Sequence, residues 1–149
     1  MAVYARILVP LEHSYADEAI LAHVRPLARL CGASLVLMHV ADGWAARHLK
    51  TLALAESEEL RADREYLEGL CTTLATEGFE AEALLGAGDP AGEIVAAAVR
   101  ERCDLIAMAT HGHRFLADVV YGSVAEEVRH QSRVPVLLVR GERRAQPRG

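Results

Sequence analysis

MATHGHRFLADVVYGSVAEEV, residues Met108–Val128, is the stretch from which the rest of the chain is interpreted. The apolar run Leu105–Ala109 leads into it, Gly112 follows closely, and Gly122-Ser123 precede a helix-like segment with acidic residues in its first turn. A strand that ends in small residues, followed by Gly-Ser at the start of a helix, places backbone N–H groups where they can face an anion. The stretch therefore predicts a phosphate-binding site at the end of a buried strand.

Apolar runs alternate with amphipathic helical patterns along the whole chain. The predicted strands are Arg6–Pro10, Ser34–Val40, Glu80–Leu85, Leu105–Ala109 and Val136–Arg140. Because the strands are mainly continuous apolar runs and are separated by helices, we expect a parallel sheet covered on both faces. The predicted fold class is α/β, a three-layer α/β/α sandwich with a five-stranded parallel sheet. Ligands bind such sheets at the carboxyl ends of strands, here the loops after Pro10, Val40, Leu85 and Ala109.

Local patterns predict where the helices begin and end. Ser14, with Asp17 three residues on, predicts an N-cap, and Gly32 predicts the C-cap of the same helix. The remaining predicted helices are Leu52–Glu77, one that opens with Asp89-Pro90, and Ser123–Gln131. Their apolar faces comprise Ile20, Val24, Leu27 and Cys31; Leu60, Leu67, Leu70 and Leu74; and Ile94, Val95, Ala98 and Val99. Residues 41–51, which include Trp44, are expected to form a long loop.

Length and composition narrow the class of protein. With 149 residues, we expect one domain over residues 1–141 and a flexible basic tail over 142–149. A net charge of −5 argues against nucleic acid as the main partner. No apolar run is long enough to cross a membrane, and the first residues lack the pattern of a signal peptide. With three widely spaced cysteines, these features favour a cytoplasmic protein with reduced thiols.

Several other motifs favour structural interpretations. Gly86–Ala91 matches GxGxxA, but it does not follow the first strand, and the next strand ends without an acid. We therefore interpret it as a turn and helix cap. His111 and His113 lack an indicated third ligand, so no protein metal site is predicted. Neither a P-loop nor a GxSxG nucleophile motif occurs, and no catalytic residue is assigned.

The central stretch resembles the motif G-x2-G-x9-G-[ST] of nucleotide-binding universal stress proteins. Here Ala109 stands in place of the first glycine, Gly112 is the second, and Gly122-Ser123 follow after nine residues. The flanks are similar too: Ile7–Pro10, His39-Val40, Asp104–Ile106, Val124–Val128 and Val134–Val139. The resemblance covers about residues 4 to 140. A second departure is Glu12-His13, where the family usually has Asp-Gly.

The resemblance implies an adenine nucleotide alpha hydrolase-like fold with strand order 3-2-1-4-5. It implies ATP or AMP as the ligand, Mg²⁺ held through the phosphates, and a homodimer joined through Val136–Arg140. It also implies a regulatory role in the stress response rather than an enzymatic one. The implied nucleotide-binding residues are Pro10, Leu11, Glu12, Val40, Ala109, Gly112, His113, Arg114, Gly122, Ser123 and Val124.

Three alternatives stay open from the residues themselves. Ser123 can be a helix cap with Glu126 completing a capping box, with or without a bound phosphate. Ala109 and His13 can make the pocket vestigial in a dimeric interaction protein. A slow ATPase is the third possibility.

Overall fold

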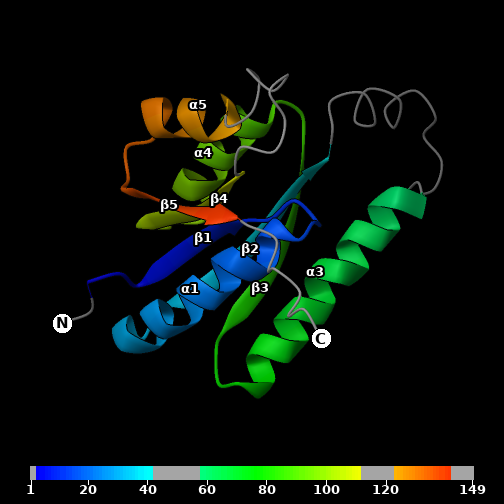
Figure 1. The fold of residues 1–149 in the computed structure, drawn as a ribbon, viewed down its shortest axis with the longest axis vertical. Coiled ribbons are helices and arrows are strands. Elements are labelled where there is room, and N and C mark those ends of the chain that lie inside the picture. The colour runs from blue at the N-terminus through cyan, green and yellow to red at the C-terminus, as the bar shows by residue number, and fades with distance from the viewer. Residues whose placement is uncertain (1–2, 42–57, 112–122, 142–149) are drawn as a thin grey trace, which may run out of the picture.

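Five parallel strands form the middle layer of the protein, and helices cover both of its faces (Figure 1). The computed structural model describes residues 3–41, 58–111 and 123–141. The elements in chain order are β1 (Arg6–Pro10), α1 (Ala16–Cys31), β2 (Ser34–Ala41), α3 (Glu58–Thr76), β3 (Ala81–Ala87), α4 (Pro90–Arg100), β4 (Leu105–His111), α5 (Ser123–Gln131) and β5 (Val136–Gly141). The predicted three-layer α/β/α class is confirmed.

The strand order is β3-β2-β1-β4-β5, as the resemblance implied. β1 pairs in parallel with β2 on one side, where Ile7 lies opposite Leu35, and with β4 on the other, where Ile7 lies opposite Leu105. After β1, the chain adds β2 and β3 on one side of it and then crosses over to add β4 and β5 on the other side. A crevice opens beyond the carboxyl end of β1, where the strand order reverses.

Two cores form because successive side chains of a strand point to opposite faces. Ile7 and Val9 of β1 pack in the core under α1 and α3, whereas Leu8 packs in the core under α4 and α5. In β2, Leu35 and Leu37 follow the first pattern, and Val36 and Met38 follow the second. Figure 1 shows α1 and α3 together on one side of the sheet and α4 and α5 on the other. Burial on both faces explains why the strands are continuous apolar runs.

The predicted helix ends are partly right. Gly32 has the left-handed φ of 67° and ends α1, with its N–H donating to Ala28. Asp89 caps α4, and its side chain accepts from the Gly92 N–H at 2.9 Å. The prediction for Ser14 was wrong, because α1 begins at Ala16 after Tyr15. The Ser14 hydroxyl accepts from the Ala16 N–H at 3.3 Å. The Asp17 side chain accepts from the loop amides of Glu12 and His13.

Two further details differ from expectation. Val99 of α4 is 68% exposed. The buried stripe of this helix runs through Ala91, Ile94, Ala97 and Ala98, and the next residue is turned by about 100° away from it. Strand ends also differ, and β3 begins one residue later than predicted. β2, β3, β4 and β5 extend further than predicted, because strand pairing continues to Ala41 opposite Ala87 and to His111 opposite Gly141.

Some predicted features lie outside the described residues. These are the loop that contains Trp44 beyond residue 41, the first part of the helix predicted from Leu52, and the basic tail over 142–149. Within the described part of the chain, no helix is long and apolar enough to cross a membrane.

All three cysteines lie in the described part of the chain, and all are free thiols. Burial raises the pKa of Cys71, and it raises the pKa of Cys103 to about 11. Because the thiolate is the reactive form, these two thiols should react slowly near neutral pH.

Gly141 permits the close contact between the end of β5 and the start of α1. A Cβ at this position would lie 2.7 Å from the Ala16 Cβ and 3.1 Å from its Cα. We therefore expect Gly141→Ala to lower the free energy of unfolding by about 2 kcal/mol, measured by urea titration. Gly69→Ala is the matched control, because a Cβ there would meet nothing within 4 Å on the exposed side of α3. The control should gain about 0.5–1 kcal/mol, and equal effects at both sites would contradict the contact.

Candidate functional site

A pocket of about 190 Å³ lies at the carboxyl ends of the inner strands. Its lining comes from the ends of β1, β2 and β4, the loop after β1, and the first turns of α1, α4 and α5: Pro10, Leu11, Glu12, Asp17, Met38, His39, Val40, Pro90, Ile94, Met108, Ala109 and Val124. This is the crevice expected where strand order reverses. It is smaller than the 300–1,000 Å³ or so of pockets that hold whole drug-sized ligands. Its size therefore suits one flat ring system.

The lining is mainly aliphatic, and its charged groups are acidic. Met38, Val40, Ile94 and Met108 supply apolar walls from both sides of β1. Glu12 and Asp17 are the carboxylates among the described lining residues, which include no lysine or arginine. Such a surface favours the uncharged part of a ligand, because a phosphate in this position would face two carboxylates, with no lysine or arginine among the described lining residues to compensate its charge.

Six of the predicted binding residues meet in this pocket: Pro10, Leu11, Glu12, Val40, Ala109 and Val124. They come from four separate parts of the chain, at the ends of β1, β2 and β4 and the start of α5. Gly112, His113, Arg114 and Gly122 lie outside the described residues. Ser123 opens α5, and its side chain is not described. Glu126, considered as the capping partner of Ser123, is exposed and forms an ion pair with Arg129 at 2.8 Å.

The first turn of α4 contributes two lining residues that sequence analysis missed. Gly86–Ala91 was interpreted as a turn and a cap, and Asp89 does cap α4. The helix that starts at this turn also places Pro90 and Ile94 in the pocket wall. Gly86 makes room for another wall residue, because a Cβ there would lie 2.7 Å from the Met38 Cε. The available signal was the position of this turn directly after a strand, at the ligand-binding edge of the sheet.

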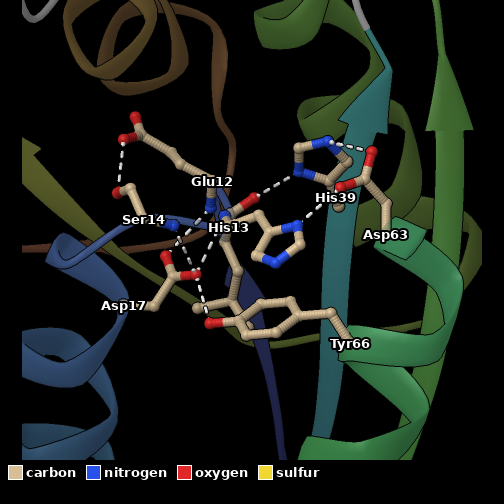
Figure 2. A network of polar contacts seen from close by, with 8 residues as sticks. Glu12, His13, Ser14, Asp17, His39, Asp63 and Tyr66 are labelled. Atoms are coloured by element: carbon tan, nitrogen blue, oxygen red, sulfur yellow. Dashed lines mark hydrogen bonds and ion pairs between the residues drawn. The ribbon is translucent and has the colours of Figure 1, made fainter. Parts of the chain in front are cut away.

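Asp17 holds the loop after β1 in shape. Its side chain is 2% exposed. Its two oxygens accept from the backbone N–H groups of Glu12 at 2.9 Å, His13 at 2.9 Å and Ser14 at 3.3 Å (Figure 2). The Tyr66 hydroxyl donates to the same carboxylate at 2.7 Å. Four donors thus compensate one buried carboxylate, which fixes the loop that lines the pocket.

Tyr66 joins α3 to this loop through both its hydroxyl and its ring. Burial, with the hydrogen bond to Asp17 and the charge of that carboxylate, raises the pKa of Tyr66 well above its ordinary value. The phenol therefore stays protonated and keeps donating to Asp17. Its ring stacks on the His13 imidazole, with centroids 4.0 Å apart and planes 16° apart.

A second contact between α3 and the site runs through Asp63, which is 8% exposed. Its Oδ1 lies 2.8 Å from the His13 Nδ1, and its Oδ2 lies 3.3 Å from the His39 Nε2. The other ring nitrogen of His39, Nδ1, lies 2.9 Å from the carbonyl oxygen of Leu11. Sequence analysis missed Asp63, Tyr66 and the role of Asp17. The signal was an acid on the apolar stripe of each helix, at Asp17 beside Ile20 and at Asp63 between Leu60 and Leu67.

Asp17→Asn tests the support of the loop. In the variant, the side-chain NH2 group would face N–H and O–H donors that now meet a carboxylate oxygen. We therefore expect a loss of about 3 kcal/mol in the free energy of unfolding, measured by urea titration. Tyr66→Phe removes one donor and keeps the ring stack, and it should cost about 1 kcal/mol. If Asp17→Asn costs no more than Tyr66→Phe, the carboxylate does not organise the loop.

His13 occupies a left-handed conformation, with φ of 60°, that glycine adopts more readily. His13→Gly and His13→Ala both remove the ring, so their difference reports the backbone alone. We expect the glycine variant to be more stable than the alanine variant by about 1 kcal/mol in urea unfolding. At His23, inside α1, the order should reverse by about the same amount. Alanine ahead of glycine at both positions would contradict the left-handed conformation.

The chain was compared with known proteins. The sequence model of the universal stress protein family matches residues 4–140. Universal stress protein MJ0577 of Methanocaldococcus jannaschii is 29% identical over 155 residues, with 93% of this chain and 96% of that protein covered. A universal stress protein of Methanothermobacter thermautotrophicus is 32% identical over 146 residues, with 93% and 97% covered.

Solved structures show the same fold. The structure of MJ0577 superposes with a TM-score of 0.80 at 28% identity, covering 97% of this chain and all of the other (100%). The universal stress protein of Archaeoglobus fulgidus in complex with dAMP has a TM-score of 0.69 at 23% identity, covering 93% and 99% of the two chains. The match over residues 4–140, together with these relatives, shows that the chain belongs to the universal stress protein family.

Proposed function

We propose that the protein binds an adenine nucleotide, ATP or AMP, and acts as a regulatory stress-response protein rather than as an enzyme. The observation that carries the proposal is the pocket, in which residues from β1, β2, β4 and α5 meet at the point where strand order reverses. An aliphatic slot of about 190 Å³ suits the base, and the acidic groups at one side of it suit the ribose hydroxyls next to the base. Relatives support the ligand class, since solved family structures hold dAMP and cAMP.

The walls of the pocket suggest a division of roles. Val40, with Met108 and Ile94, would hold the adenine ring between apolar surfaces. Glu12 would accept hydrogen bonds from ribose hydroxyls, because its carboxylate is at the exposed side of the loop after β1. Pro10 and Leu11 would complete the slot beside the base, and Ala109 would lie near the sugar.

Phosphates would extend from this slot toward the start of α5. Val124 lines the pocket and follows Ser123, the first residue of that helix. A helix N-terminus has free N–H groups and a partial positive charge that favour an anion. We propose that Gly112, His113, Arg114, Gly122 and Ser123 hold the phosphates there, with Mg²⁺ bound through the phosphate oxygens rather than by protein ligands.

The homodimer through Val136–Arg140 remains a prediction of the resemblance. β5 is the edge strand of the sheet beside β4, and Val136–Val139 are only partly buried within this one chain. A partly apolar edge strand is protected when another strand pairs with it. We therefore propose that a second copy of the chain covers β5.

Ala109 tests the ligand assignment, because its methyl group lies in the pocket wall. We expect ATP to bind the wild-type protein in calorimetric titration, and Ala109→Gly to bind it at least as tightly. Ala109→Val adds two methyl groups to the slot and should weaken binding by about tenfold or more. Ala96→Val makes the same change on the exposed side of α4 and should leave the affinity unaltered.

Three results would count against the proposal in different ways. No nucleotide released on denaturing the purified protein, together with no heat at millimolar ATP, would reject it. Binding that requires Ala109→Gly together with His13→Gly would show a vestigial pocket. Phosphate release faster than a buffer control would favour a slow ATPase.

A further inference from the structure

His13, Asp63 and His39 join three separate parts of the fold beside the pocket (Figure 2). His13 belongs to the loop after β1, His39 to β2, and Asp63 to α3, so the carboxylate connects residues distant in sequence. Asp63 and His39 are largely shielded, with side chains 12% and 17% exposed, whereas the His13 side chain is 41% exposed. We call this group the His–Asp–His cluster.

The hydrogen bonds of His39 require more protons than a neutral imidazole carries. Its Nδ1 lies 2.9 Å from the Leu11 carbonyl oxygen, which can only accept. Its Nε2 lies 3.3 Å from a carboxylate oxygen of Asp63, which also accepts when ionised. A neutral imidazole has one N–H, so it satisfies one of these two acceptors, whereas the imidazolium satisfies both. His13, in contrast, needs a single proton on Nδ1 to donate to Asp63.

Among the described residues, the charged and titratable groups around the cluster are mainly acidic. The loop after β1 and α1 contribute Glu12, Asp17 and Glu18, and α3 contributes Asp63 and Tyr66. On the β3 side, the residue opposite His39 is Leu85, which is apolar. The charge of a histidine ordinarily changes between about pH 5 and 8.

The cluster acts directly on the pocket wall. Leu11 and His39 both line the pocket, and the bond between them joins the loop after β1 to the end of β2. When His39 carries both protons, it holds Leu11 on one side and Asp63 on the other. When it loses one, either the Leu11 carbonyl or the Asp63 carboxylate faces a nitrogen lone pair, and the tie between loop, strand and helix is weakened.

We propose that the His–Asp–His cluster is a proton-dependent clamp, in which His39 and Asp63 are positioning residues for the adenine-nucleotide pocket. The proposal rests on the nucleotide-binding function given above. It determines the sign of the pH effect: binding is tighter at the acidic end of the range, where His39 is protonated, and weakens as pH rises and the proton is lost. The effect should be about five- to tenfold in dissociation constant, the size expected for the loss of one ordinary hydrogen bond.

Adenosine is the probe, because its charge does not change in this range whereas phosphate groups titrate within it. Calorimetric titrations of the full chain at several values from about pH 5.5 to about pH 8.5 should show a rising dissociation constant. His39→Asn keeps an amide donor near the Nδ1 position but cannot titrate, so its dissociation constant should be flat with pH. Asp63→Asn should reduce the slope, because it replaces the carboxylate that faces the charged ring with a neutral amide.

His23→Asn is the matched control, because His23 is an exposed histidine on α1 outside the pocket. It should keep the wild-type pH profile. A wild-type profile that is flat, or a slope that persists in His39→Asn, would overturn the proposal. Thermal unfolding of each variant at each pH shows whether a changed affinity reflects loss of the fold.

Ring-nitrogen NMR of the ligand-free protein separates failure of the clamp from failure of the nucleotide assignment. We expect the two ring nitrogens of His39 to report the imidazolium at about pH 5.5, and the amide signals of residues 11–13 to shift together with its deprotonation. If no adenosine or ATP binds at any pH, the proposed function fails, and these spectra still decide the clamp. A His39 ring that is neutral throughout the range would overturn it.

Discussion

The two-sided burial of β1 is the constraint from which the site follows. Ile7, Leu8 and Val9 are all fully buried, because α1 and α3 cover one face of the sheet and α4 and α5 cover the other. Because the strands are parallel, β1 and its neighbours all end at the same edge of the sheet. The ends of β1, β2 and β4 therefore meet, and the pocket forms where the connections on either side of β1 diverge.

The loop after β1 is shaped by interactions that are expensive to break. Asp17 is buried with four hydrogen-bond donors around it, three of them consecutive backbone amides. The three amides turn toward one carboxylate, and within this turn the backbone of His13 is left-handed. A histidine there loses some backbone stability relative to glycine but gains a stacking contact with Tyr66 and a hydrogen bond to Asp63. His13, which stands where the family usually has glycine, thus makes its own contacts in this fold.

The charge distribution separates two parts of the proposed ligand. The described pocket lining contains carboxylates and apolar groups, which favour a neutral ring and hydroxyl groups. The start of α5, whose second residue Val124 lines the pocket, has the free N–H groups and partial positive charge that favour an anion. In the proposed complex, the base would lie between the apolar walls and the phosphates would lie toward the start of α5.

The sequence by itself determined the α/β class, because two-sided burial requires continuous apolar runs between amphipathic helices. With the family resemblance, it also determined the strand order and six pocket residues, since their motifs are local in the chain. Only the tertiary structure decided that Asp63 meets His13 and His39, and that Pro90 and Ile94 line the pocket. Those contacts join side chains far apart in sequence, and helix packing brings them together. A local pattern can show that Asp17 and Asp63 interrupt an apolar stripe, but the donors that compensate them come from other elements.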